Sequence, residues 1–279
     1  MMNSSAVHKR LAVCSWSLQP ADPQDLADKV LATGLQRVQL ALDPLRTMPA
    51  QWGQTPAVLG EAGIAMVSGM FGCVGEDYAT LDSIRATGGI APDSTWSQNL
   101  ANIKATAGLA ADLGLNLVTF HAGFVPHDPT DATHAKMQNR LAAVADIFAA
   151  KNVRLGLETG QETAASLVAF LAALNHPNLC VNFDPANLIL YGQGDPVAAV
   201  LQLGSAIHQV HIKDARHTQV PGSWGEELPV GAGEVDWPGF FQALRQCNFT
   251  GDYVIEREAG TQRSPDVCQA RELVLKLAP

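Results

Sequence analysis

The sequence is poor in cationic residues and in cysteine, and it has no long hydrophobic run. Lys and Arg number 18 against 27 Asp and Glu, and the formal net charge of −9 disfavours binding to nucleic acid and to anionic membranes. The five cysteines form no C-x-x-C pair, which argues against a disulfide framework or a thiolate metal site and favours a reducing cytoplasm. No run approaches the roughly 18 apolar residues of a membrane span, and the first 20 residues are too polar for a signal peptide. We therefore expect a soluble, cytoplasmic protein.

What the sequence does contain is enough apolar material for a large core. It has 279 residues, of which 47% are hydrophobic and 16% charged. Short β-rich runs alternate with longer segments of helical period from one end to the other. The runs expected as strands are residues 11–18, 37–43, 64–72, 117–123, 154–160, 179–185, 207–214 and 252–258. The segments expected as helices are residues 23–33, 49–61, 97–113, 132–150, 163–174, 196–203, 238–246 and 265–276.

Eight consecutive βα units without a linker predict an α/β fold, a single (β/α)8 TIM barrel that forms one domain over residues 1–279. An open, doubly wound sheet is the alternative that fits the same order of elements. Residues 73–99 and 215–236 are longer than a βα loop needs, and both follow the carboxyl end of a strand. In a barrel, active sites lie on that face, so these stretches are expected to form lids or substrate walls, although residues 73–99 would also fit a plain surface insertion.

Polar residues stand near the carboxyl ends of five successive strands, where a barrel would otherwise be apolar. Side chains two apart share a face of a strand, so each strand directs one such set into the lumen. The expected sets are Thr119 with His121, Gly156 with Glu158, Asn182 with Asp184, His211 with Gln209 and Lys213, and Glu256 with Glu258. Glu158, Asp184, His211 and Glu256 come from the last four strands and should converge above the barrel axis. Three carboxylates in one cleft need a cation to remain ionised together, which predicts one divalent metal ion: Mn²⁺, Mg²⁺, Co²⁺ or Zn²⁺.

The motifs around these residues resemble those of a known superfamily. They are LGLET at 155–159, NFDPAN at 182–187, VHIKD at 210–214, PVGAGEVD at 229–236 and VIERE at 254–258. As an ordered set they resemble the xylose-isomerase-like TIM-barrel superfamily, and within it the sugar-phosphate isomerases and epimerases, close to ketose 3-epimerases. The resemblance implies a metal held by Glu158, Asp184, His211 and Glu256, with Glu158 and Glu256 doubling as catalytic acid and base. It also implies a small sugar or sugar phosphate as substrate, and barrels of this group are often homo-oligomers.

Two positions depart from the pattern of the 3-epimerases. A substrate-contacting His after the sixth strand is replaced by Asn187, and an Arg after the seventh is replaced by His217. Both are kept as candidate substrate-binding residues, together with His121 and Lys213. His121 fits a substrate hydrogen bond, a second metal or a structural role, and Lys213 fits a substrate contact or a salt bridge to Asp214 or Glu258.

Several further residues have weaker assignments. Trp16, Phe71 and Trp224 could cover the apolar face of a sugar, Glu234 could cap its loop, and Asp236 fits a helix N-cap.

The chemistry expected of such a site is the transfer of a proton next to a carbonyl. A metal that binds the carbonyl and a neighbouring hydroxyl stabilises an enediolate, while one glutamate removes the proton and the other returns it. A dehydratase of the same barrel type, acting on an inosose or on dehydroshikimate, is the main alternative. Two further alternatives are an apurinic-site endonuclease and a non-catalytic binding barrel. The endonuclease fits poorly, because Asn187 replaces a His expected of that group and the net charge of −9 disfavours DNA binding.

Overall fold

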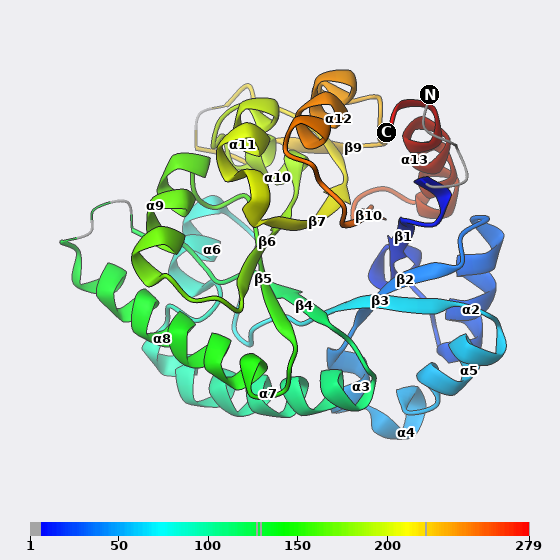
Figure 1. Cartoon of the computed structure of the whole chain (residues 1–279), viewed down its shortest axis with the longest axis horizontal. Coiled ribbons are helices and arrows are strands. Elements are labelled where there is room, and N and C mark those ends of the chain that lie inside the picture. Colours follow the sequence, from blue (N-terminus) through cyan, green and yellow to red (C-terminus); the bar gives the residue numbers. More distant parts are fainter. Residues whose placement is uncertain (1–6, 127, 129, 221, 279) are drawn as a thin grey trace.

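The structure is a computed structural model, and it describes residues 7–126, 128, 130–220 and 222–278. Eight parallel strands form a closed barrel in the order β1-β10-β7-β6-β5-β4-β3-β2 (Figure 1). The strands are β1 (Leu11–Cys14), β2 (Arg37–Ala41), β3 (Ala65–Met70), β4 (Leu117–Phe120), β5 (Arg154–Glu158), β6 (Leu179–Phe183), β7 (Ile207–Ile212) and β10 (Asp252–Ile255). Because β1 pairs with both β2 and β10, the sheet has no edges, so the predicted barrel is confirmed and an open sheet is excluded.

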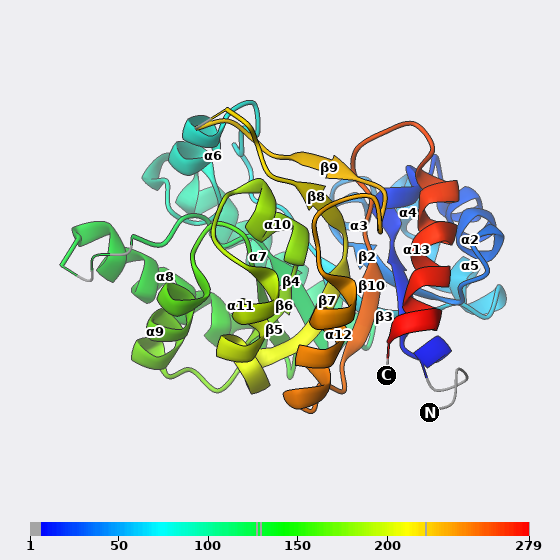
Figure 2. The same cartoon turned by 90° about the horizontal axis from the view of Figure 1, so that it is seen from above.

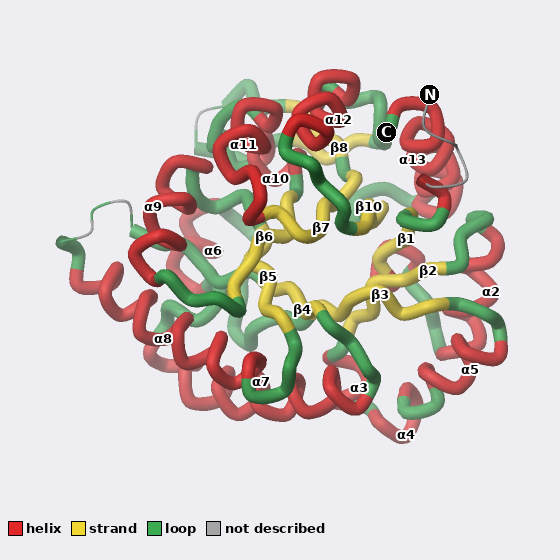
Figure 3. Tube along the Cα trace, in the orientation of Figure 1, coloured by secondary structure: helices red, strands yellow, loops and turns green. Residues whose placement is uncertain are grey.

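Helices surround the barrel (Figure 3). The main ones are α2 (Pro23–Ala32), α5 (Thr55–Glu61), α7 (Asp93–Asp112), α8 (Ala132–Ala149), α9 (Ala164–Leu174), α11 (Pro196–Leu203), α12 (Trp237–Gln246) and α13 (Arg263–Leu277). Their starts follow local rules: Asp22, Asp195 and Asp236 each accept a backbone hydrogen bond in the first turn, and a proline follows each within the first two positions. No helix within the described part of the chain is long and apolar enough to cross a membrane.

The elements differ from the sequence prediction at several places in the first half of the chain. The expected strand 11–18 ends at Cys14 and continues as a 3-10 helix, η1 (Ser15–Leu18). The helix expected at residues 49–61 is divided into α4 (Pro49–Trp52) and α5, and it is preceded by the short α3 (Asp43–Thr47). Pro56 lies in the first turn of α5, where it has no N–H to bond back to α4, so one continuous helix cannot form. The stretch 73–99 also contains α6 (Leu81–Thr87), which begins with a capping box between Thr80 and Ser83.

In the second half, additional elements follow the carboxyl ends of β6 and β7. Helix α10 (Pro185–Leu190) begins directly after Asp184, and a hairpin of β8 (Asp214–Arg216) and β9 (Glu226–Leu228) occupies part of the stretch 215–236. Figure 2 shows this hairpin and α6 along one edge of the molecule. The segments that follow the carboxyl ends of β3 and β7 lie at this edge, so it is the carboxyl face of the barrel.

The barrel lumen contains a buried polar layer. Gln39 Nε2 donates to Thr119 Oγ1 at 2.9 Å, and Ser68 Oγ donates to Gln209 Oε1 at 2.6 Å. These bonds join strands that are not neighbours in the sheet, so the side chains must cross the lumen, as the alternation of side chains predicts for Thr119 and Gln209. The large apolar side chains, such as Phe120 and Phe183, are fully buried in the main hydrophobic cluster.

Candidate metal centre and adjoining cavity

The closed barrel brings Glu158, Asp184, His211 and Glu256 together at its carboxyl face. Glu158 ends β5, Asp184 follows β6, His211 lies in β7 and Glu256 follows β10, and these four strands are successive neighbours. One potential ligand atom from each residue lies within 4.8 Å of all the others. This convergence agrees with the prediction from the alternation of side chains along the strands.

His211 occupies the middle of the cluster. Its Nδ1 atom lies 3.4 Å from Glu158 Oε1, 3.4 Å from Glu256 Oε2 and 3.7 Å from Asp184 Oδ2. The four residues are at most 5% exposed, yet His211 Nδ1 and Asp184 Oδ2 have no partner in hydrogen-bond geometry. Buried polar atoms are normally satisfied, so atoms of ligand type left unpaired and facing one another fit a bound cation.

The other side of the His211 ring is held by the polar layer of the lumen. His211 Nε2 lies 2.8 Å from Gln39 Oε1, and the Gln39 amide nitrogen is directed to Thr119. The Asn182 amide nitrogen also contacts Nε2, at 3.1 Å, and donates to Glu158 Oε2. With its oxygen toward the ring, Gln39 accepts the Nε2 proton, so Nδ1 is the ring atom that faces the carboxylates and would supply a lone pair to a cation bound there.

The electrostatics of the cluster keep two of its carboxylates ionised. Burial alone would raise the pKa of Glu158, but the positive charges of His121 and His211 outweigh it and lower the pKa. Burial also opposes ionisation of Glu256, yet Lys213 and His211 hold its pKa well below the usual range. The pKa of Asp184 is raised, chiefly by burial. Glu158 and Glu256 therefore have the protonation state that a base requires.

Lys213 lies beside the cluster and is itself buried. Its Nζ atom is 2.9 Å from Glu256 Oε2, 2.5 Å from Glu258 Oε2 and 3.9 Å from Asp184 Oδ2. Burial would lower its pKa, but the surrounding carboxylates, first Glu256 and then Glu258, raise it well above the usual value. Of the salt bridges considered from the sequence, the structure shows the one to Glu258, while Asp214 accepts hydrogen bonds from Gly231 N and Trp237 Nε1.

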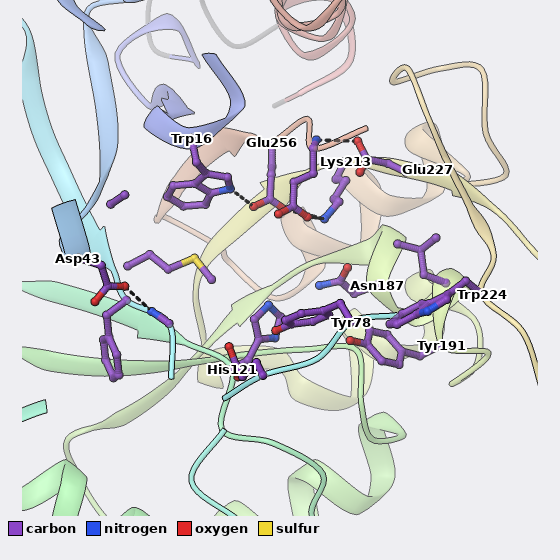
Figure 4. Close-up of a pocket in the computed structure, with 17 residues that line it drawn as sticks. Trp16, Asp43, Tyr78, His121, Asn187, Tyr191, Lys213, Trp224, Glu227 and Glu256 are labelled. Atoms are coloured by element: carbon purple, nitrogen blue, oxygen red, sulfur yellow. Dashed lines mark hydrogen bonds and ion pairs between the residues drawn. The ribbon is translucent and has the colours of Figure 1, made fainter. Parts of the chain in front are cut away.

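A cavity of about 440 Å³ opens above the cluster (Figure 4). Glu256 lines it directly, and Trp16 Nε1 donates to Glu256 Oε1 at 2.8 Å. Glu158 is covered by two residues that do line it, since His121 Nε2 lies 3.4 Å and Asn187 Nδ2 3.2 Å from Glu158 Oε1. Burial would lower the pKa of His121, but Glu158 and Glu76 raise it above its usual value.

Aromatic side chains form much of the cavity wall. Trp16, Phe71 and Trp224, which the sequence analysis singled out, all line it, and so do Tyr78 and Tyr191. Trp224 packs edge-on against Tyr191 with ring centroids 4.7 Å apart. Tyr78, Tyr191 and the acidic Glu76 were not predicted from the sequence. They lie in loops or just after α10, where no periodicity predicts the direction of a side chain.

Both long stretches on the carboxyl face contribute to this wall. Glu76 and Tyr78 come from residues 73–99, and Trp224 and Glu227 come from the stretch that holds the β8–β9 hairpin. The expectation that these stretches form substrate walls agrees with this placement.

The four candidate substrate-binding residues do not all lie together. His121, Asn187 and Lys213 line the cavity, whereas the exposed His217 pairs with Glu234, its Nδ1 atom 2.6 Å from Glu234 Oε2. Glu234 also accepts the His217 backbone N–H, so it organises its own loop. Asp236 caps α12 through Gly239 N, as expected.

Comparison with known proteins agrees with the barrel and its motifs. A model of the xylose isomerase-like TIM barrel family matches residues 25–277. The crystal structure of a xylose isomerase domain protein from Planctomyces limnophilus has a TM-score of 0.84 to this chain at 30% sequence identity, covering 90% of this chain and 91% of that one. The D-psicose 3-epimerase of Clostridium cellulolyticum H10, solved with D-tagatose, has a TM-score of 0.71, but at 18% identity over 96% of this chain and 99% of that one it shows the fold alone.

Among curated proteins, the L-ribulose-5-phosphate 3-epimerase UlaE of Salmonella paratyphi A is 27% identical over 191 residues. The match covers 65% of this chain and 64% of that protein, so the chain spans less than two thirds of this relative. The family model, in contrast, extends from α2 to the end of α13 and describes the barrel that is observed. The chain therefore belongs to the xylose isomerase-like TIM barrel family.

Proposed function

We propose that this chain is a divalent-metal-dependent enzyme that isomerises or epimerises a small sugar. The observation that carries the proposal is the convergence of Glu158, Asp184, His211 and Glu256, with unpaired His211 Nδ1 and Asp184 Oδ2 atoms, beneath a cavity walled by aromatic rings. The name of the UlaE relative, an epimerase of a ketose phosphate, supports a sugar as substrate.

The four residues of the cluster would hold one divalent cation. Three carboxylates and one imidazole suit Mn²⁺, Mg²⁺, Co²⁺ or Zn²⁺. Such a cation, when bound, would polarise a substrate carbonyl and stabilise the negative charge that forms as the neighbouring C–H loses its proton.

The proton itself is moved by the chain's own carboxylates. Glu256 faces the cavity in ionised form, and it is oriented by Trp16 Nε1 on Oε1 and by Lys213 Nζ on Oε2. Glu158 also contacts His211 Nδ1 and acts as the second proton carrier, next to His121 and Asn187. One carboxylate takes the proton and the other returns it, which gives epimerisation or isomerisation according to the carbon that receives it.

The proposal is tested by exchange of substrate C–H protons in D₂O. Glu158→Gln and Glu256→Gln each keep the size of the side chain but remove its basicity, so exchange should fall below detection in both. Glu226→Gln is the matched control, because Glu226 is exposed, pairs with Arg216 on the β8–β9 hairpin and does not line the cavity. Near-normal exchange in both site variants would rule out the assignment.

Two further measurements separate the alternatives. A product of unchanged mass indicates isomerisation, whereas loss of water indicates a dehydratase of the same barrel type. Calorimetric titration with Mn²⁺ should show one site in the native chain and strongly weakened binding in Asp184→Asn. A protein that takes up no divalent ion would instead favour a non-catalytic barrel.

A further inference from the structure

The cavity above the candidate metal centre is lined by more acidic than basic side chains. Five carboxylates contribute to its wall: Asp43, Glu76, Glu227, Glu256 and Glu258. Among the described residues that line it, Lys213 is the single lysine or arginine. We infer that the substrate is an uncharged sugar or polyol, and that a phosphorylated sugar is rejected. This inference rests on the proposed function and specifies its substrate class.

Lys213 is already fully engaged by carboxylates. Its Nζ atom bridges Glu256 at 2.9 Å and Glu258 at 2.5 Å, and its side chain is 4% exposed. A phosphate group that used Lys213 would have to displace Glu256, whose side chain is buried, or approach Glu258, whose side chain is 53% exposed and carries charge of the same sign as the phosphate. Removing one member of a buried ion pair is strongly destabilising, so Lys213 is not free to receive a phosphate.

The other positive groups near the cavity are occupied in the same way. Arg46 lies 2.6 Å from Asp43 Oδ1, and Arg257 lies 2.7 Å from Glu227 Oε1 and 2.8 Å from Asp266 Oδ2. His121 faces Glu158 Oε1 at 3.4 Å. Arg46, Arg257 and His121 thus each have a carboxylate of this chain beside them. Arg263 donates to the backbone oxygen of Glu258.

The backbone donors at the start of α10 do not supply a phosphate site either. Helix α10 begins beside the cavity. The backbone N–H groups of Ala186 and Asn187 in its first turn donate to Asp184 Oδ1 at 2.8 and 3.0 Å, so they are not available to a phosphate. A phosphate monoester carries about −1.5 to −2 charges near neutral pH, and proteins bind it with unpaired Arg or Lys side chains or free helix N-termini. In this cavity it would meet carboxylates instead.

The same wall suits a neutral polyhydroxylated ligand. Carboxyl oxygens accept hydrogen bonds from hydroxyl groups, so the side chains of Glu76 and Glu258 match the hydroxyl donors of a sugar. The rings of Trp16, Tyr78 and Trp224 offer apolar surface for the C–H faces of a sugar. The carboxyl groups can bind the hydroxyl groups of a sugar, and the aromatic rings can pack against its C–H groups. Together they can recognise a sugar that has no charged substituent.

The inference is tested by binding, which does not depend on turnover. The Mn²⁺-loaded protein is titrated calorimetrically with matched pairs: L-ribulose against L-ribulose 5-phosphate, and D-tagatose against D-tagatose 6-phosphate. We expect at least one free sugar to bind about 100-fold more tightly than its phosphate, and inorganic phosphate not to compete with it, because the added charge faces several carboxylates. Equal or tighter binding of the phosphates, or no binding of either free sugar, overturns the inference.

A charge variant tests whether the wall is the cause of the preference. Glu258→Gln removes one of the two partners of Lys213, so the ratio of the two dissociation constants should fall about tenfold. Glu226→Gln makes the same change outside the cavity and should leave the ratio within about twofold. If both variants keep the native ratio, the acidic wall does not select the substrate. If a free sugar binds with the expected preference but shows no C–H exchange, the proposed function fails while the inference about charge stands.

Discussion

Glu162 gives a quantitative prediction about the pH dependence of stability. The residue lies between β5 and α9, is 8% exposed, and accepts a hydrogen bond from Val125 N at 3.2 Å. Burial raises the pKa of its carboxyl group from 4.5 to about 7. The unfolded chain therefore releases this proton near pH 4.5, while the folded chain holds it until about pH 7.

Between these two values the folded state binds more protons than the unfolded state, so stability falls as the pH rises. One pKa unit corresponds to about 1.36 kcal/mol, which makes the contribution of Glu162 to this loss about 3 kcal/mol, complete above pH 7. Glu162→Gln keeps an oxygen that can accept the Val125 N–H but carries no charge at any pH. Relative to the native chain, the variant should therefore gain about 2.5 kcal/mol of stability on going from pH 5 to pH 8.

The measurement is urea-induced unfolding of both proteins at pH 5 and at pH 8. Other groups that titrate in this range contribute equally to the free energy of unfolding of both proteins. Their contribution therefore cancels when the free energy of the native chain is subtracted from that of the variant at each pH. Glu61→Gln, at the exposed end of α5, is the control and should change this difference by less than about 0.5 kcal/mol. If Glu162→Gln and the native chain lose the same stability between pH 5 and pH 8, the buried carboxyl is not the cause.

Three other substitutions test the site and the core. Gln39→Leu removes the acceptor that holds His211 Nε2 and should weaken Mn²⁺ binding about 10- to 100-fold in a calorimetric titration; unchanged affinity would show that Gln39 does not orient the ring. Phe148→Ala, at a fully buried position on α8, should lower the free energy of unfolding by about 3–5 kcal/mol in denaturant titration, and a loss below about 1 kcal/mol would mean that the core closes around the gap. Asp195→Ala removes the N-cap of α11 and should cost about 1 kcal/mol in the same assay, unlike Asp195→Asn, which keeps an acceptor.

Much of the architecture could be predicted because its signals are local. Strand and helix periods repeat every few residues, and caps such as Asp195 and Asp236 act within one turn. Boundaries were less predictable at the carboxyl ends of the strands. The expected strand 179–185 ends at Phe183, because Asp184 turns the chain into α10 by accepting hydrogen bonds from Ala186 N and Asn187 N.

The candidate site was predictable for the same reason, but only in part. Glu158, Asp184, His211 and Glu256 stand at equivalent positions of successive strands, so the alternation of side chains is enough to place them on one rim. Tyr78 and Tyr191 carry no such signal. His217 follows β7 closely in the sequence, yet the hairpin takes it to Glu234 and away from the residues that line the cavity.

The sequence alone therefore determined the βα order and the positions of the four strand-end residues, since both follow from short-range patterns along the chain. The open sheet that fits the same order was excluded only by the pairing of β1 with both β2 and β10. Barrel closure decided the remaining contacts. It sets Trp16 Nε1 against Glu256 across 240 positions of sequence, and Gln39 against His211 across 172. It also surrounds Lys213 with carboxylates from other segments. These contacts depend on how distant strands meet in space, and that is fixed only when the whole sheet closes.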